Sequence, residues 1–393
     1  MGRRSLRASS HSHSATAHSV TAQEPFSTRV VTTLEEFQTL STSWNDLLRE
    51  TASDNIFLTW EWLYTWSKHY LATHRLWIIL VFKDRDCLVG IAPFYIRTRH
   101  AYGGVVLREM RFLGTEEVSS VYLDVIVREK HRAGVLRHIF RHLHDEAVAH
   151  WDVLLLCDLP AESSSIDRWT ALIQEPGKVM EIVGTTACPI IRLPRCREDF
   201  LSGLTRNARY NLQRKRRRLA EAGAVAYDRV PSIHEVAAAM DVFIRLHQRR
   251  WEQKGTRGVF RSHRFLRFHR EIAMLFSERK WLELDFLSLN GDPIAGIYGY
   301  AYNGRYSFYL PGFDPTVVPD VSPGILLLVH RIEDAIRDGY EEVDLLRGHH
   351  DYKMAWANGL RRCLTIRYYN SHMRAAVFKL LESGKDAVKI LLR

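Results

Sequence analysis

Apolar residues recur along the chain with two periods, one typical of amphipathic helices and one typical of buried strands. In the first half, Leu58, Trp62 and Trp66 at four-residue spacing predict a helix over 54–70. Runs rich in β-branched and aromatic residues predict a hairpin, joined by a charged turn. The two strands of this hairpin are 76–82 and 88–96. The remaining elements expected in this half are a strand over 121–127, a helix over 134–149 and a strand over 151–156.

The second half repeats this order of elements. Asn-Gly turns separate the expected strands, and a helix with one apolar face is followed by a short apolar strand. Gly134 and Gly324, which begin the two helices, lie 190 residues apart, and so do Val153 and Val343 in the following strands. We interpret this register as an internal duplication. The expected elements are strands over 281–289, 294–302, 305–310 and 343–346, and helices over 197–223, 233–255, 263–280 and 324–338.

Length and composition agree with a globular protein of more than one module. The chain has 393 residues, of which 46% are hydrophobic and 25% charged, and no apolar run approaches the roughly 20 residues of a spanning helix. We predict an α/β (α+β) fold with two modules, each a mixed, largely antiparallel sheet with helices on its faces. The expected domains are a disordered basic tail over 1–26, modules over 27–195 and 196–370, and an amphipathic helix over 371–393.

The net charge of +10 is concentrated in two segments. Residues 1–23 carry three arginines, and residues 205–218 carry seven basic residues, both without an acid, so the rest of the chain is balanced. A solvated helix of that kind would repel itself. The pattern favours an anionic partner at 205–218: a phosphate, a lipid headgroup or tRNA.

Cysteines and common motifs exclude several classes of protein. The five cysteines form no CxxC pair, which favours a reduced, cytoplasmic location, with a peripheral membrane position left open. The chain also lacks a Walker loop, GxGxxG, HExxH and GxSxG, so the usual support for ATPases, dinucleotide dehydrogenases, zincins and serine hydrolases is missing. No metal site is predicted.

Asp320-Val321-Ser322-Pro323-Gly324 is the most informative helix start. Ser322 can cap the helix, Pro323 suits its first turn, and Gly324 lets a ligand approach the backbone. Free N–H groups at such a terminus can bind phosphate. An ordinary capped helix is the commoner explanation of the pattern.

Two further clusters carry titratable groups. Asp344, His349, Tyr352 and Lys353 follow a buried strand, at the edge where α/β sheets bind ligands. Asp344 or His349 could accept a proton and Tyr352 could donate one, although a solvated loop explains each residue equally well. The second cluster comprises His247, Arg250 and Trp251, where an arginine could hold an anion and the indole could stack on a ligand.

Taken together, four segments resemble the GNAT acyltransferase superfamily, in particular its cellulose-biosynthesis-associated (CelD-like) acetyltransferase group. The resemblance spans most of residues 50–360, and the four segments are NIFLTWEWLYTW, TRNARYNLQRKRRRLAEAG, LHQRRWEQKGTRGVF and YLPGFDPTVVPDVSPGILLLVHRIEDAIRDGYEEVDLLRGHHDYKMAW.

The resemblance implies tandem GNAT-like modules, as in Fem-type proteins, with acetyl-CoA or another acyl-CoA bound at splayed central strands and no metal. We expect the second module to carry the chemistry, because the first lacks its polar cluster. The implied catalytic residues are Asp344 or His349 as base, Tyr352 as acid and Lys353 as an anion partner. The implied cofactor site comprises Ser322, Pro323, Gly324, Ile325 and Leu310, and the substrate site comprises His247, Arg250, Trp251, Arg206 and Arg209.

Three functions remain open at this point. The first is N-acylation of a polar acceptor amine, which by resemblance would be a small molecule or an amino sugar linked to cell-surface polysaccharide. The second is Fem-type aminoacyl transfer from charged tRNA, with the basic helix as a docking surface. The third is a non-catalytic binding subunit.

Overall fold

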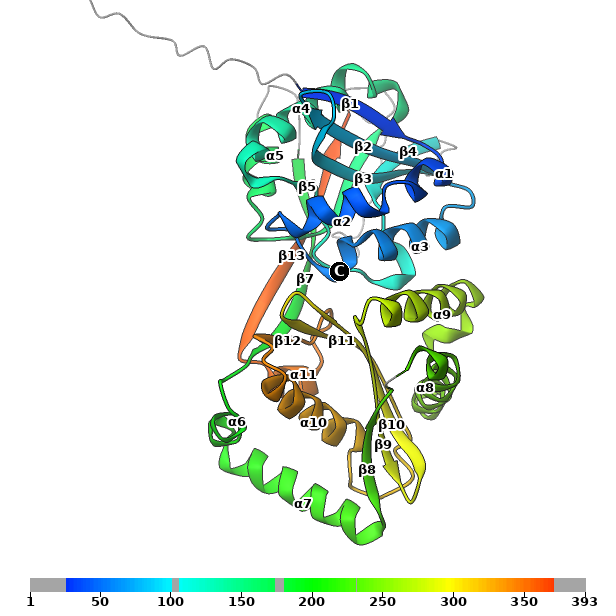
Figure 1. Ribbon diagram of the computed structural model, residues 1–393, viewed down its shortest axis with the longest axis vertical. Helices are drawn as coiled ribbons and strands as arrows, with labels where there is room; N and C mark the ends of the chain where they lie inside the picture. The colour runs from blue at the N-terminus through cyan, green and yellow to red at the C-terminus, as the bar shows by residue number, and fades with distance from the viewer. Residues whose placement is uncertain (1–25, 101–105, 174–179, 231, 371–393) are drawn as a thin grey trace, which may run out of the picture.

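A single sheet runs through the whole molecule (Figure 1). The computed structural model describes residues 26–370, except 101–105, 174–179 and 231. Its sheet has thirteen strands in the order β1-β2-β3-β4-β6-β13-β7-β12-β11-β10-β9-β8, with β5 paired to β3. The described pairings are antiparallel apart from β4 with β6 and β11 with β12. The predicted mixed, largely antiparallel sheet is therefore confirmed.

The first module places helices over a meander of four strands. Its core is aromatic: Trp44, Trp62 and Trp66 are fully buried, and the Trp62 indole donates a hydrogen bond to Ser120. Its strands are β1 (Phe26–Val31), β2 (Arg75–Lys83), β3 (Cys87–His100), β4 (Val106–Phe112), β5 (Ile126–Val127) and β6 (Val153–Pro160). Its helices are α1 (Leu34–Gln38), α2 (Ser41–Arg49), α3 (Trp60–Tyr70), α4 (Arg132–Asp145) and α5 (Ser164–Ile173).

The second module repeats the meander, the helix and the parallel strand. The predicted turns hold Asn290-Gly291 and Asn303-Gly304 at positive φ, which is the conformation that two-residue hairpin turns require. Its strands are β8 (Val225–Arg229), β9 (Leu282–Leu289), β10 (Asp292–Tyr302), β11 (Arg305–Phe313) and β12 (Glu342–Asp344). Its helices are α6 (Arg197–Gly203), α7 (Arg206–Ala222), α8 (Ile233–Gln253), α9 (His263–Glu278), α10 (Pro323–Arg337) and α11 (Asp351–Trp356).

Two long strands join the modules by a reciprocal exchange, visible in Figure 1 as the pair that runs between them. β7 (Met180–Arg192) follows the first module in sequence but pairs with β12 of the second. β13 (Gly359–Tyr369) follows the second module but pairs with β6 of the first. The two strands also pair with each other. Each module is thus completed by a strand that the other half of the chain supplies.

Three predicted elements differ from the structure for local reasons. The helix expected over 54–70 begins at Trp60, because Asn55 caps a preceding 3₁₀ turn and Thr59 caps α3. The strand expected over 121–127 is reduced to Ile126–Val127, because Tyr122 has a positive φ. The basic helix is interrupted at Leu204, after which Thr205 caps α7.

The expected tail and terminal helix lie almost wholly outside the described residues. Residues 1–25 and the predicted helix over 371–393 are not described, and residue 26 is the first of β1.

A buried network of charges ties α10 to the sheet. Arg331, which is 1% exposed, contacts Glu283 at 3.1 Å and Asp338 at 3.1 Å, and Arg229 of β8 lies 3.3 Å from Asp285. Burial and the neighbouring Glu283 raise the pKa of Asp285 to about 8, and burial raises that of Glu283 to about 7. The folded protein therefore holds protons here that the unfolded chain releases near pH 4.

We expect the free energy of unfolding to fall as the pH rises from about 4 to 8, because the folded state binds these protons more tightly than the unfolded state. Replacing Asp285 by Asn should flatten this dependence, since the amide stays neutral throughout. Thermal unfolding measured between these pH values tests it, with the exposed Asp292→Asn as control. An Asp285→Asn profile as steep as that of the wild type would contradict the assignment.

Candidate functional site

Asp344 lies at the junction of the two modules, where β12 ends. Its side chain is 2% exposed and accepts hydrogen bonds from the Tyr122 hydroxyl of the first module at 2.7 Å and from the Leu346 amide at 2.7 Å. Arg361 of β13 is 3.3 Å away. Burial raises the pKa of Asp344 above its usual range. The carboxyl is therefore positioned by three separate elements and biased towards accepting a proton.

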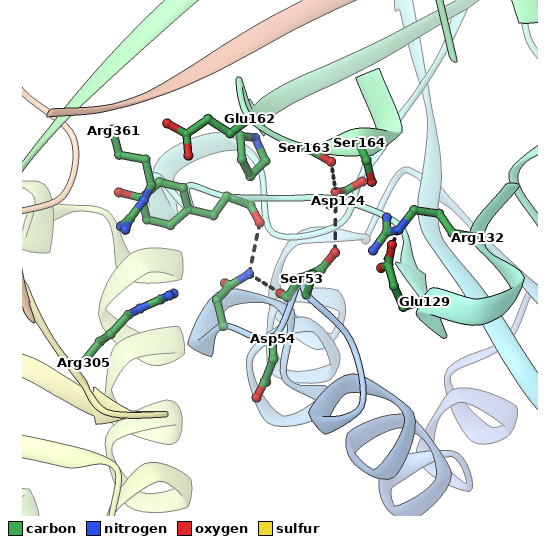
Figure 2. A pocket seen from close by; sticks show the side chains of 14 residues that line it. Ser53, Asp54, Asp124, Glu129, Arg132, Glu162, Ser163, Ser164, Arg305 and Arg361 are labelled. Carbon is green, nitrogen blue, oxygen red and sulfur yellow. Dashed lines mark hydrogen bonds and ion pairs between the residues drawn. The ribbon is translucent and has the colours of Figure 1, made fainter. Parts of the chain in front are cut away.

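A cavity of about 20 Å³, enough for about one water molecule, borders Asp344. It shares Asp54, Asn55, Tyr122 and Arg305 with a larger pocket of about 340 Å³, shown in Figure 2. A pocket of that volume is at the lower end of the range that binds small molecules. Residues that border the Asp344 cavity thus also line a space that an acceptor could occupy.

Many charged and hydroxyl side chains line the larger pocket, as Figure 2 shows. Asp124 is buried on one wall and accepts hydrogen bonds from Ser163 at 2.5 Å and from its neighbour Val125. Arg132 pairs with Glu129 at 2.9 Å at the start of α4. Charges of both signs therefore line the pocket, and its charged lining residues are Asp54, Asp124, Glu129, Arg132, Glu162, Arg305 and Arg361.

Strands β11 and β12 separate beside this site. They pair in parallel only from Arg305 to Ser307 of β11, whereas β11 itself continues to Phe313. Beyond Ser307, no described strand pairs with β11 on its β12 side. Unpaired main-chain groups on such an edge can bind an extended, amide-containing ligand. Leu310, predicted to contact the cofactor, lies on this free part of β11.

The C-terminal end of α8 packs against the same part of β11. His247 Nδ1 lies 3.0 Å from the carbonyl oxygen of Pro311, which also accepts a hydrogen bond from Arg250 at 3.3 Å. Arg250 hydrogen-bonds Tyr352 of α11, so the structure brings together two of the predicted clusters. Burial lowers the pKa of His247 to about 4, which keeps the ring neutral.

Three buried nitrogen atoms in this cluster have no hydrogen-bond partner among the described residues. They are His247 Nε2, Arg250 Nε and Trp251 Nε1, and all are buried. Buried polar atoms are nearly always satisfied in native proteins. Arg250 Nε and Trp251 Nε1 are therefore unsatisfied donors, whereas Nε2 of the neutral His247 ring is an unsatisfied acceptor, because Nδ1 donates to Pro311.

The predicted phosphate site at the start of α10 has a cation beside it. The Lys215 ammonium donates a hydrogen bond to the Ser322 hydroxyl at 2.9 Å, and Arg218 pairs with Asp320 at 3.1 Å. Gly324 lies against Phe313, since a Cβ there would approach the ring to 2.8 Å. Arg250 covers the same ring at 4.9 Å. This contact chain links the start of α10, and with it Ile325, to Arg250 and Tyr352.

The remaining predicted residues take other positions. Lys353 is 6% exposed and donates hydrogen bonds to the carbonyl oxygens of Leu345 and Arg347, and burial lowers its pKa to about 8. His349 is exposed. Arg206 and Arg209 lie exposed on α7 and make no ion pair with the described part of the chain.

Sequence reasoning missed the partners of Asp344. Tyr122 and Arg361 lie on other elements, and no spacing in the sequence associates Tyr122 with a residue 222 positions away. Arg305, which lines the larger pocket, begins a predicted strand, and no sequence pattern marks it as a functional residue.

Comparisons with known proteins agree with this architecture. Residues 206–354 match a family model described as an acetyltransferase (GNAT) domain, which covers less than half of the chain. The crystal structure of FemX has a TM-score of 0.60 at 11% identity, with 91% of this chain and 100% of that chain covered. A conserved protein of unknown function from Bacteroides thetaiotaomicron has a TM-score of 0.51 at 12% identity, covering 87% and 100%. No curated protein sequence gave a significant match.

Residues 206–354 of the second module therefore match a GNAT domain, and the predicted fold of two modules on a mixed, largely antiparallel sheet is confirmed. At 11–12% identity the two solved structures show the fold alone. Within the described ranges, no group of histidine, cysteine and acidic residues is suited to a metal ion. No helix of that part of the chain is long and apolar enough to cross a membrane.

Proposed function

We propose that the protein is an acyl-CoA-dependent N-acyltransferase acting on a polar acceptor amine. The observation that carries the proposal is Asp344: a buried carboxyl at the point where β11 and β12 separate, beside a cavity, within a module that matches the GNAT family. The CelD-like grouping and an amino sugar as acceptor remain predictions of the sequence resemblance.

The chemistry requires a base, an acid and a place for the two substrates. Bound acyl-CoA supplies a thioester carbonyl, which the acceptor nitrogen attacks as the C–N bond forms and the C–S bond breaks. Asp344 takes the proton from the nitrogen, and its contact with Tyr122 orients the carboxyl. Its burial at the module junction favours Asp344 over the exposed His349 as base.

Tyr352 is the proposed acid for the departing thiolate. Burial raises the pKa of its hydroxyl, so the side chain stays protonated at neutral pH and can donate. Arg250 holds the ring in position by a hydrogen bond. Lys353 acts indirectly. Its ammonium donates hydrogen bonds to the carbonyl oxygens of Leu345 and Arg347 and so holds the segment that follows Asp344 in place.

The phosphates of the nucleotide are assigned to the start of α10. The N-terminal end of a helix attracts anions, and Lys215 adds a positive charge there, although the Ile325 N–H already donates to the Ser322 carbonyl. The unpartnered donors Arg250 Nε and Trp251 Nε1 fit further oxygen atoms of the same ligand.

The proposal is tested first by thermal stabilisation. Acetyl-CoA at about 100 times its dissociation constant should stabilise the protein by about 2.7 kcal/mol. Lys215→Glu should weaken binding about tenfold, because it reverses a charge beside the phosphates. Arg245→Glu, an equal change of charge at an exposed position on α8, is the control. An absence of any shift with acetyl-CoA would contradict the proposed co-substrate.

Fem-type aminoacyl transfer is the second candidate, and the likeness of the whole chain to FemX supports it. The same thermal experiment separates the two. Thermal stabilisation by aminoacyl-tRNA that weakens as the salt concentration rises, together with no thermal stabilisation by acetyl-CoA, would favour this alternative.

A further inference from the structure

Helix α7 has two different faces. On its inner face, Leu212 and Leu219 are buried, and Arg216 pairs with Glu333 of α10 at 2.8 Å. Lys215, on the same side, contacts Ser322. Part of the basic charge of this helix is therefore used inside the protein.

The outer face of α7 comprises Arg206, Arg209, Tyr210, Gln213 and Arg217, which follow the three- and four-residue spacing of one helix side. All five are exposed, and Tyr210 is an exposed aromatic at 63%. The one ion pair found for this face in the described part of the chain joins Arg217 to Glu221 at 3.8 Å, and such exposed pairs stabilise little. No acidic residue occurs in α7 before Glu221. Arg206 and Arg209 therefore keep positive charges that no residue of the described part of the chain pairs with.

We propose that the outer face of α7 docks the protein on an anionic phospholipid surface. Basic residues are attracted to anionic lipid, and a tyrosine placed among them suits the headgroup region, where aromatic side chains with a polar end accumulate. From Arg206 to Arg217 the face extends about 16 Å, which is enough to meet several headgroups.

The position of the helix favours a membrane over a nucleic acid. Figure 1 shows α7 at the end of the second module that is farthest from the first, with its outer side turned away from the rest of the fold. A lone helix at the end of the molecule presents a convex surface, which can lie on a flat bilayer. Proteins that bind single-stranded nucleic acid combine basic charge with a groove and several stacking rings.

Docking goes beyond the proposed acyl transfer and does not depend on it. Because the inner face of α7 packs on α10, docking would hold the second module close to the membrane. An acceptor presented at that surface would then be near the enzyme.

Co-sedimentation of the full chain with vesicles tests the proposal in the absence of acyl-CoA. We expect binding to phosphatidylcholine vesicles that contain about 30 mol % phosphatidylglycerol and little binding to phosphatidylcholine alone. Binding should be lost at about 1 M salt, where screening reduces the reach of charge to about 3 Å. Equal binding to both kinds of vesicle would overturn the proposal.

The double variant Arg206→Glu/Arg209→Glu should lower the partition coefficient at least about tenfold, because each basic residue near the surface contributes substantially. Arg245→Glu/Arg267→Glu makes the same change of charge at exposed positions of α8 and α9 and is the matched control. The neutral variant Arg206→Gln/Arg209→Gln should give a smaller loss of binding in the same direction. It keeps the proposal testable if the Arg206→Glu/Arg209→Glu variant does not fold. Equal losses in the α7 and control variants would overturn the proposal, as would binding to tRNA with none to anionic vesicles.

Discussion

Asp344→Asn is expected to lower the rate of coenzyme A release by about 10² to 10⁴, the usual contribution of a general base. Asparagine keeps the shape of the side chain and can still accept a hydrogen bond from the Leu346 amide, but it cannot take a proton from the acceptor. Steady-state release of coenzyme A with candidate amines measures the effect. Binding of acetyl-CoA by the variant should change little, because the phosphates are assigned to the start of α10.

The pH profile separates this role from a structural one. In the wild type, kcat/KM should rise with pH through the pKa of Asp344, which burial places above the usual range of an aspartic acid, because only the carboxylate accepts a proton. The variant should lose that rise. Glu342→Gln is the control. Glu342 lies on the same short strand as Asp344 and pairs with the same arginine, Arg361 of β13, at 2.9 Å. Equal rate losses in both variants would assign the effect to the arginine contact and not to Asp344.

Dividing the chain between residues 195 and 196 should prevent the first half from folding alone. Residues 26–195 would contain β6 and β7 without β13, and β13 contributes Cys363, Ile366 and Tyr368 to the core at no more than 2% exposure. Burying a large apolar side chain contributes about 1.5–3 kcal/mol, and a typical domain is stable by only about 5–15 kcal/mol. Circular dichroism and size-exclusion chromatography of the separate half measure the outcome.

Co-expression of residues 196–370 should restore a soluble one-to-one complex, because it returns β13 to β6 and gives β7 its partner β12. Co-expression of a second half carrying Ile366→Asp provides the comparison, since a charge would be buried at a position that is 1% exposed. A first half that is monomeric and unfolds with a sharp thermal transition on its own would refute the structural importance of the exchange.

Locally encoded features were predictable from the sequence, and those that depend on distant partners were not. Asn303-Gly304 and the Pro323 helix start are set by neighbouring residues, so turn rules and the preference of proline for a first helical turn were sufficient. The predicted Ser322 cap was wrong, because its hydroxyl accepts a hydrogen bond from Lys215 and makes none to the helix backbone. β7 contains Gly184 and Pro189, which weaken a strand signal, and it is held by pairing with residues far along the chain. The site divides in the same way. Asp344 stands out as an acidic residue at the end of a buried strand, whereas its contact with Tyr122 arises only when the modules pack.

The exchange of β7 and β13 also has a consequence for synthesis on the ribosome. The first module is made first, yet its sheet needs the strand Gly359–Tyr369 beside β6. Until those residues emerge, the nascent protein exposes an unpaired strand edge, the kind of surface on which aggregation begins. Folding of the first module must therefore wait for translation of residues 359–369, and a chaperone that shields β6 during that interval would be expected to raise the yield of native protein.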